Sequence, residues 1–251
     1  MNLFYSPEII SETIHITLSE EESSHCIRVL RMKKGNKIFL TDGKGMFYEG
    51  EISAEHSKKC SVKIIRSIPD SAKRNFNLTI AIAPTKSIDR FEWFLEKATE
   101  IGCDEIIPIA CRHSERTVIK TERLNKVIVS AMKQCLKSQF PKLYEIMDFK
   151  NFIEATGRDL KSRPTQKFIG HIPELSESEF PPQHPPGKSL HIVCKKGENI
   201  IIAIGPEGGF SEDEVALAVK NGFTAISLGN SRLRVETAGV AACTIVNAIN
   251  A

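Results

Sequence analysis

Two glycine-bearing segments near the carboxyl end of the 251-residue chain hold the residues whose types and spacing could do chemistry. The first is Gly205-Pro206-Glu207-Gly208-Gly209-Phe210, which follows the apolar run 200–204, and the second is 229–238, which follows the run 224–228. Glycines directly after a strand permit positive φ angles and let a ligand approach the backbone, at the strand end where α/β sheets bind ligands. We therefore expect both segments to face one crevice, although each alone is also typical of a tight turn.

Three familiar catalytic templates do not fit these segments. The run Gly187-Lys188-Ser189 lacks the first glycine of a phosphate-binding P-loop, because position 182 is proline. The run 229–233 lacks the final glycine of a nucleophile elbow. The first segment is not G-x-G-x-x-G, and Pro206 lacks the backbone N–H that a pyrophosphate would use. A dinucleotide-dependent oxidoreductase therefore stays only a distant alternative.

The cysteines do not form a metal or disulfide pattern. There are seven, an odd number, with no C-x-x-C pair and no histidine at ligand spacing. They stand at positions 26, 60, 103, 111, 135, 194 and 243. Buried free thiols in a reducing compartment are the better interpretation, and no metal is expected.

The composition is that of an ordinary globular protein, with 41% apolar and 26% charged residues. No apolar run reaches the roughly 20 residues needed to cross a bilayer, and the best candidate, 238–249, is interrupted by polar residues. The start of the chain lacks the basic segment and apolar core of a secretory signal. We therefore expect a cytoplasmic protein with no membrane partner.

The net charge of +3 conceals two basic zones. Residues 25–75 carry twelve Lys and Arg against five acids, and residues 112–142 carry eight against two. Lys and Arg gain free energy when they displace counterions from phosphates, so these zones favour a polyanion partner. Two solvated surfaces would give the same pattern, and charge alone does not choose between the two interpretations.

The pattern of elements divides the chain into two parts. Residues 1–72 contain a helix start at 19–22 and short apolar runs around a turn at 42–45, which predicts a small antiparallel barrel. Residues 76–251 alternate strands with helices, which predicts an α/β layered fold. The predicted strands are 78–83, 105–109, 189–193, 199–204 and 224–228, and the predicted helices are 87–101, 121–138, 211–222 and 237–249. A linker is predicted at 69–73, and a proline-rich exposed loop at 175–188.

Taken together, the two glycine segments resemble the SPOUT methyltransferase superfamily, and within it the small-subunit ribosomal RNA uracil-N3 methyltransferases. The hallmarks of that family are G-P-E-G-G-F and, about twenty residues later, L-G-x-x-I-L-R-x-E-T-A, which match Gly205 to Phe210 and Leu228 to Ala238 here. Nearly the whole chain shares the resemblance. Further family positions are Phe4 to Pro7, His25 to Arg31, Asp42 to Gly45, Lys97 to Gly102 and Ser114 to Arg116. Departures are Arg232, where the family usually has an apolar residue, Val235, where Thr is common, and Lys137, where many members have Arg.

The resemblance implies an N-terminal PUA-like barrel, residues 1–72, and a C-terminal SPOUT methyltransferase domain, residues 76–251, tied in a trefoil knot and working as a homodimer. It also implies S-adenosylmethionine as cofactor and no metal. Adenine would lie among the loops around the two glycine segments, with 169–171 as a further wall. The implied cofactor-binding residues are Ile204, Gly205, Pro206, Glu207, Gly208, Gly209, Leu228, Gly229, Ser231, Leu233 and Thr237.

The implied reaction, methyl transfer to N3 of a uracil, requires help with a proton. Arg234 is always cationic, so it is suited to stabilise negative charge on the ring oxygens but not to act as a base. Alternatively, Arg234 could form an ion pair with Glu236 or Glu207. Because N3 lies on the Watson–Crick edge, the target must be unpaired or flipped out. The residues expected to hold RNA are Arg28, Arg31, Lys33, Lys34, Arg116 and Lys137.

Two rival functions stay open at the level of sequence. A related SPOUT enzyme acting on another RNA or atom would carry the same cofactor motifs, because these identify the methyl donor better than the acceptor. A non-catalytic RNA-binding or ribosome-assembly factor could also retain the fold. The leading hypothesis is a ribosomal RNA methyltransferase whose partner is ribosomal RNA or the small ribosomal subunit.

Overall fold

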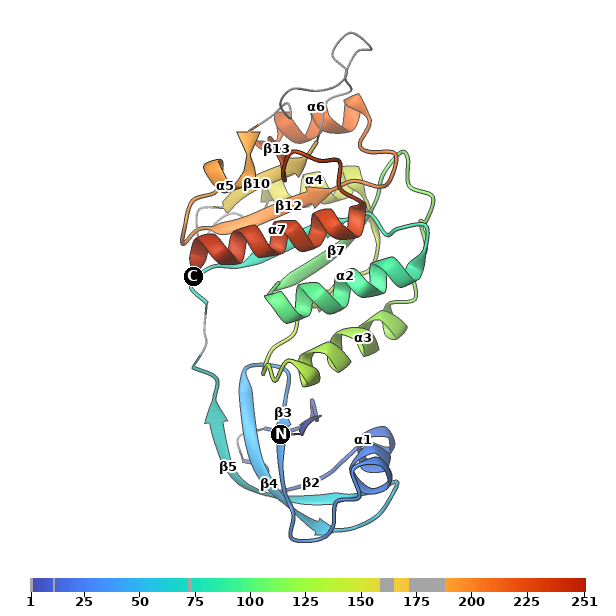
Figure 1. Cartoon of the computed structure of the whole chain (residues 1–251), viewed down its shortest axis with the longest axis vertical. Helices are drawn as coiled ribbons and strands as arrows, with labels where there is room; N and C mark the ends of the chain where they lie inside the picture. The colour runs from blue at the N-terminus through green and yellow to red at the C-terminus, as the bar shows by residue number, and fades with distance from the viewer. Residues whose placement is uncertain (1, 11, 72–73, 159–164, 172–187) are drawn as a thin grey trace. The chain divides into compact units, whose positions relative to one another are not determined.

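The computed structural model in Figure 1 describes residues 2–10, 12–71, 74–158, 165–171 and 188–251. The chain divides into two compact units: Met1–Lys73 with Val129–Phe140, and Arg74–Ile128 with Pro141–Ala251. Most of the predicted proline-rich loop, 175–187, and the end of the predicted linker, 72–73, lie outside the described residues.

The first unit is built on a five-stranded sheet in the order β1-β3-β4-β5-β2. Strands β3 to β5 pair antiparallel as predicted, β1 pairs parallel with β3, and β2 pairs antiparallel with β5. Their bounds are Leu3–Tyr5 for β1, His15–Thr17 for β2, Lys37–Thr41 for β3, Met46–Ala54 for β4 and Ser61–Pro69 for β5. The buried side chains Phe4, Leu40, Tyr48, Ile52 and Val62 fill its core.

Helix α1, Glu20–Ser24, begins where the sequence predicts. The Ser19 hydroxyl accepts a hydrogen bond from the backbone N–H of Glu22 at 3.2 Å, which caps the first turn. A π-helical turn, His25–Val29, follows directly and ends before Arg31, whose φ is +53°. A left-handed backbone is uncommon for a residue other than glycine, so the chain bends sharply at Arg31.

The second unit is built on an eight-stranded sheet in which the pairings are parallel. Its main order is β11-β13-β10-β12-β6-β7-β8, with β9 also paired to β7. The bounds are Leu78–Ile82 for β6, Glu105–Ala110 for β7, Lys142–Leu143 for β8, Met147–Asp148 for β9, Thr165–Gly170 for β10, Lys188–Ser189 for β11, Asn199–Ile204 for β12 and Thr224–Ser227 for β13.

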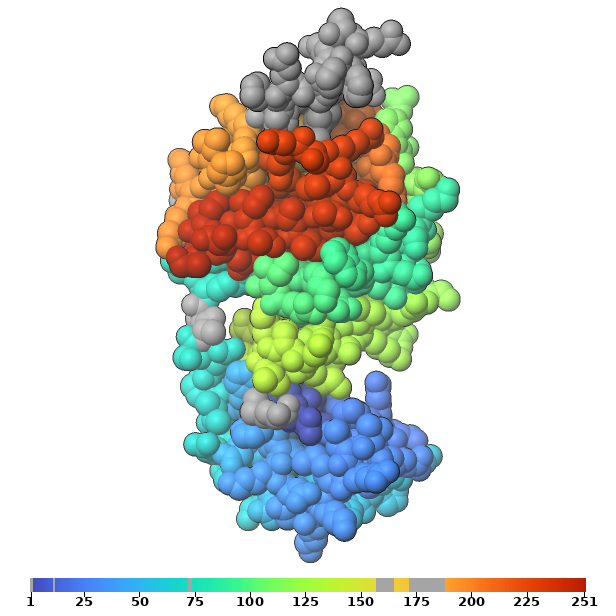
Figure 2. Space-filling model, viewed as in Figure 1, coloured from blue at the N-terminus to red at the C-terminus, as the bar shows by residue number. Residues whose placement is uncertain are grey.

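Helices cover both faces of this sheet. On one face α2, Ile88–Ile101, packs against α7, Val235–Asn250, and Figure 2 shows the two side by side. The approach is close, because a Cβ added to Gly239 of α7 would lie 3.0 Å from Ile82 Cδ1. On the other face α4, Phe149–Arg158, and α6, Glu212–Lys220, pack over Ala81 and its neighbours. Helix α3, Thr121–Gln134, runs from the second unit into the first.

One predicted strand is wrong. Residues 189–193 do not form a strand, because only Lys188 and Ser189 pair with β13 and the next four residues make the short helix α5, Leu190–Val193. The N–H of Cys194 donates to the carbonyl of Leu190 at 2.9 Å, which is a helical bond. Leu190 is buried and Ile192 is exposed, so the apolar run does not lie flat in the sheet. Short apolar runs do not separate helix from strand.

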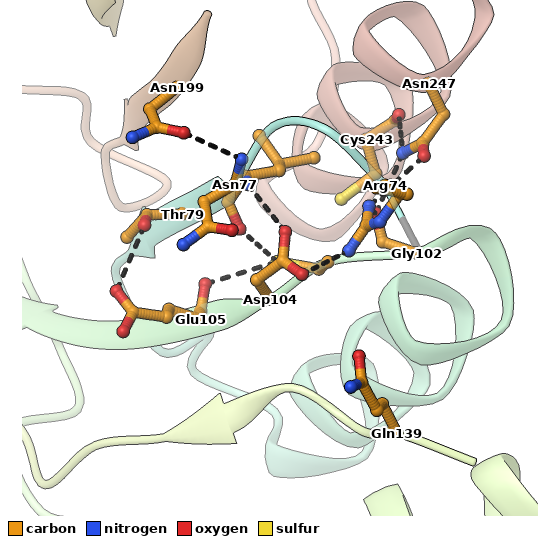
Figure 3. A network of polar contacts seen from close by, with 12 residues as sticks. Arg74, Asn77, Thr79, Gly102, Asp104, Glu105, Gln139, Asn199, Cys243 and Asn247 are labelled. Atoms are coloured by element: carbon orange, nitrogen blue, oxygen red, sulfur yellow. Dashed lines mark hydrogen bonds and ion pairs between the residues drawn. The ribbon is translucent and has the colours of Figure 1, made fainter. Parts of the chain in front are cut away.

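A polar network fixes the amino-terminal ends of β6, β7 and β12 (Figure 3). Asp104 accepts from the guanidinium of Arg74 and from the N–H of Leu78, the latter at 2.7 Å. Asn199 Oδ1 accepts from the N–H of Asn77 at 3.0 Å, and Arg74 also donates to the carbonyl of Gly102 at 2.9 Å. Hydrogen bonds among these residues therefore hold this end of the sheet together. The glycine segments lie at the opposite end.

Candidate functional site

The two glycine segments meet at the carboxyl edge of the parallel sheet. Strand β10 lies between β12 and β13, and Gly170 at its end is in register with Ile204 on one side and Ile226 on the other. The loops that follow β12 and β13 therefore emerge on either side of His171, at one edge of the sheet. The single crevice expected between them stays a prediction. The predicted cofactor residues lie on these loops and the flanking element ends: Ile204, Gly205, Pro206, Glu207, Gly208, Gly209, Leu228, Gly229, Ser231, Leu233 and Thr237.

Two glycines on these loops leave the backbone open to a ligand. Gly209 has φ +72° and Gly229 has φ +146°, and nothing lies within 4 Å of a Cβ added to either residue. A left-handed backbone favours glycine at both positions, and the missing side chains leave free space beside the peptide groups. The residues present thus fit a ligand that packs closely against the backbone, such as the adenine end of a nucleoside cofactor.

Neighbouring loops hold the loop 205–210 in place. The Glu207 carboxylate accepts a hydrogen bond from the backbone N–H of Lys86, in the loop after β6, at 3.0 Å. His113, in the loop after β7, has Nδ1 3.2 Å from the carbonyl oxygen of Gly209. A Cβ on Gly208 would lie 2.9 Å from His113 Cβ, so the two loops are in close contact. At least one role of Glu207 is therefore to fix loop geometry.

The helix that follows the first glycine loop starts with the predicted capping box. The Ser211 hydroxyl accepts from the N–H of Glu214 at 3.3 Å, and the Glu214 carboxylate accepts from the N–H of Ser211 at 2.8 Å. The other carboxylate oxygen of Glu214 accepts from the N–H of Arg112 at 2.8 Å. One carboxylate thus joins α6 to the loop after β7.

Arg234 stands at the N-cap position of α7 and is exposed. Glu236 is buried and lies near Arg90, at 3.9 Å between the charged atoms, whereas Glu207 bonds the Lys86 amide. Among the described residues, no ion pair joins Arg234 to Glu236 or to Glu207. The guanidinium therefore keeps donors available for a ligand beside the second glycine loop.

Two cavities lie in the second unit, and the second glycine loop lines one of them. The first, about 610 Å³, is lined by Lys188 to Ser189, His191 to Val193 and Ser227 to Asn230, so it includes Leu228 and Gly229. No sequence motif marks its other wall, where Ser189 Oγ lies 2.7 Å from His191 Nδ1. The second, about 460 Å³, is lined by Lys86 and residues 115–118.

The predicted RNA-binding residues divide between the compact units. Arg28, Arg31, Lys33 and Lys34 are exposed on the first unit, which also contains Lys137. Arg116 belongs to the second unit. Its Nε donates to the carbonyl of Thr85 at 3.0 Å and its Nη2 donates to the carbonyl of Lys86 at 2.7 Å, so part of the guanidinium organises the loop after β6.

Burial shifts the protonation of two groups near the site. Burial lowers the pKa of His171, which favours its neutral form. Burial raises the pKa of the Cys111 thiol and so disfavours a thiolate. None of the seven cysteines forms a disulfide, and all except Cys135 are buried.

Within the described part of the chain, no group of three or more His, Cys, Asp or Glu is arranged to hold a metal ion. Across the same residues, no helix is both long and apolar enough to cross a membrane.

The fold and site define a class: an α/β domain with an open ligand edge between neighbouring parallel strands, joined to a small β-rich module. Residues 72–247 match the family model described as RNA methyltransferase domain, and residues 18–65 match the RNA methyltransferase PUA domain. The chain therefore belongs to the RNA methyltransferase family, which confirms the family resemblance drawn from the two motifs.

Known relatives extend over nearly the whole chain. Ribosomal RNA small subunit methyltransferase E of Synechocystis is 26% identical, covering 98% of this chain and 77% of the relative, and that of Bacillus subtilis is 24% identical, covering 95% and 91%. The crystal structure of a probable rRNA methyltransferase from Porphyromonas gingivalis is 37% identical, with a TM-score of 0.86, covering 100% of this chain and 98% of the other. The Neisseria gonorrhoeae small-subunit methyltransferase E, solved with bound S-adenosyl methionine, is 25% identical, with a TM-score of 0.81 and the same coverage.

Proposed function

We propose that this protein transfers a methyl group from S-adenosylmethionine to N3 of a uridine in small-subunit ribosomal RNA. The observation that carries the proposal is the edge of the sheet at the ends of β10, β12 and β13, where Gly209 and Gly229 leave open space. The exposed Arg234 lies at the end of the second loop. The names of the full-length relatives support ribosomal RNA as substrate. The Neisseria structure with its bound ligand supports the methyl donor.

In this proposal each glycine loop contributes backbone groups to the cofactor site. Gly209 and Gly229 leave space at the peptide groups, and Lys86 and His113 hold the first loop. The bound cofactor would supply an electrophilic methyl group. Arg234 would donate hydrogen bonds to a uracil oxygen as negative charge develops there, which lowers the barrier without a change in its own protonation.

The division at 1–72 and 76–251 is part of the proposal, with the first domain binding RNA. Its exposed cations Arg28, Arg31, Lys33 and Lys34 would contact phosphates, with Lys137 of the same compact unit. Such contacts fix the position of RNA but carry no sequence information, so the target nucleotide must be selected through contacts to its base. We also propose a homodimer, which light scattering after size-exclusion chromatography would test as twice the 28.0 kDa chain mass.

Methyl transfer into small ribosomal subunits from a strain lacking this gene tests the function. Labelled S-adenosylmethionine is expected to give 3-methyluridine in the small-subunit RNA. Arg234→Ala should lower the rate about 10²–10³-fold, as for loss of one charge-stabilising donor. The matched control is Arg232→Ala, because Arg232 is also exposed on the loop and departs from the apolar residue of the family motif. Label in another nucleoside would favour a methyltransferase of different specificity, and cofactor binding without label would favour a non-catalytic RNA-binding factor.

A further inference from the structure

The cavity lined by Lys86 and residues 115–118 has no part in the proposed cofactor site. It belongs entirely to the second unit and has a volume of about 460 Å³. Its charged lining consists of Lys86, Glu115 and Arg116, and its remaining lining consists of Thr117 and Val118. Two cations and one carboxylate therefore surround one cavity, with an exposed apolar side chain, Val118, at its wall.

These groups complement the edge of one particular base. The Watson–Crick edge of uracil presents an acceptor, a donor and an acceptor, namely O4, N3–H and O2. Lys86 and Arg116 can only donate, and the Glu115 carboxylate can only accept. Cytosine presents a different order of donors and acceptors, with an amino group where uracil has O4, so it would place a donor against a cation.

We propose that this cavity receives the target uracil and that Glu115 accepts the proton from N3, an inference that rests on the proposed function. In the step, the bond between N3 and the methyl carbon forms while the carbon–sulfur bond of the donor breaks, and sulfur keeps that electron pair. The N3–H bond breaks, its electrons stay on the ring, and the proton passes to a Glu115 oxygen. Because N3 becomes much more acidic as the new bond forms, a carboxylate suffices as acceptor.

The cavity adjoins the first glycine loop. Lys86, whose side chain lines the cavity, donates its backbone N–H to Glu207 at 3.0 Å. Arg116 donates to the carbonyls of Thr85 and Lys86, which fixes its guanidinium against the loop after β6. A base held here would therefore lie next to the segment proposed to bind the methyl donor.

In the structure, the proposed proton acceptor Glu115 forms an ion pair with Lys86. Lys86 Nζ lies 2.8 Å from Glu115 Oε2, and the pair raises the pKa of Lys86. The two side chains are 73% and 53% exposed, and an ion pair between such exposed groups contributes little to stability. A uracil can therefore replace each partner without a large cost, with one ring oxygen at Lys86 and N3–H at Glu115, and the other ring oxygen stays available to Arg234.

Binding without the cofactor gives a first test that does not depend on activity. Single-stranded RNA pentamers containing uridine, 3-methyluridine or cytidine at the centre are titrated into the full chain by fluorescence anisotropy. Uridine should bind at least several-fold more tightly than the other two, because 3-methyluridine lacks the N3–H donor. Glu115→Ala should remove this preference, and equal preference in wild type and variant would overturn the proposal.

The kinetic test separates proton acceptance from binding. Glu115→Gln keeps an oxygen acceptor but cannot take the proton, so the kcat should fall about 10²–10⁴-fold while the KM for RNA changes little. Its rate should rise with pH, as ionised uracil replaces the missing acceptor. The matched control Glu122→Gln removes an exposed carboxylate at the start of α3, outside the cavity, and should keep the wild-type kcat.

The two hypotheses fail in distinguishable ways. If the wild-type protein makes 3-methyluridine and Glu115→Gln makes it at the same rate, the Glu115 assignment is overturned while the function stands. If the wild-type protein methylates no uridine N3, the function fails, and the uridine preference in the binding test decides whether the cavity still recognises uracil. Melting curves of both variants must match wild type, so that loss of folding does not imitate loss of the proton acceptor.

Discussion

At the scale of single residues, Gly209 combines a left-handed backbone with open space at its Cα. Its φ of +72° disfavours any side chain, and the structure shows nothing within 4 Å of an added Cβ. Gly209→Ala should cost about 1–2 kcal/mol of folding free energy from backbone strain. The added methyl group would also occupy the space that the cofactor needs. We therefore expect a modest fall in Tm together with a loss of S-adenosylmethionine affinity, measured by isothermal titration calorimetry.

Gly222→Ala provides the matched control for Gly209→Ala. Gly222 has φ +84°, also has nothing within 4 Å of an added Cβ, and follows α6 away from both glycine loops. Its stability cost should be similar because the backbone strain is similar, but its cofactor affinity should equal that of wild type. Equal affinities for the two variants would show that the space beside Gly209 is not used by the cofactor.

We expect the partly buried His171 to make the free energy of unfolding depend on pH. Burial lowers its pKa below the usual value of 6.5, so between the two pKa values the unfolded chain binds more protons than the folded chain. The free energy of unfolding therefore rises with pH in that window, and stability is lost as the pH falls through 6.5. His171→Gln should flatten the pH dependence of the urea midpoint between pH 5 and 7. An unchanged slope would contradict the assignment.

At the scale of elements, Glu214 joins α6 to the loop after β7. Its carboxylate accepts from the N–H groups of both Ser211 and Arg112. Ser211→Ala should cost about 1 kcal/mol through the lost cap. Glu214→Ala should cost more, because it also leaves the Arg112 amide without this partner. The exposed neighbour Asp213→Ala should change Tm little, and equal Tm values for the Glu214 and Asp213 variants would contradict this account.

The sequence predicted those elements whose ends are marked by local sequence motifs. The capping box predicted the start of α6, and the glycine segments predicted loops at neighbouring strand ends. Strand β10 was missed as an element because Thr165–Gly170 is mostly polar at its start and is stabilised by pairing on both sides. The roles of Lys86 and His113 were also missed, because their partners lie 121 and 96 residues away in sequence. Such contacts depend on strand order, which periodicity does not encode.

At the scale of the whole molecule, the first compact unit is not a continuous stretch of chain. Residues 129–140 pack with residues 1–73, although the periodicity assigned 129–138 to the second half of a helix in the α/β part. The ring of Phe140 lies 5.7 Å from that of Tyr5, and the N–H of Gly45 donates to the carbonyl of Ser138 at 3.1 Å. The helical pattern predicted α3 but not which unit its end would join. The trefoil knot implied by the family resemblance stays a prediction.

The ion pair between Glu22 and Lys133 tests this arrangement. Glu22 is buried, Lys133 Nζ donates to its Oε1 at 2.6 Å, and within the described residues its Oε2 has no hydrogen-bond partner. Lys133→Met would leave a buried carboxylate without its cation, which costs up to about 3 kcal/mol. Glu22→Gln alone should cost less, because a neutral amide is easier to bury. The double variant should recover most of the Lys133→Met loss, since no buried charge then remains. Additive losses in urea unfolding would show that the two side chains do not interact in solution, and that 129–140 does not stabilise the first unit through this pair.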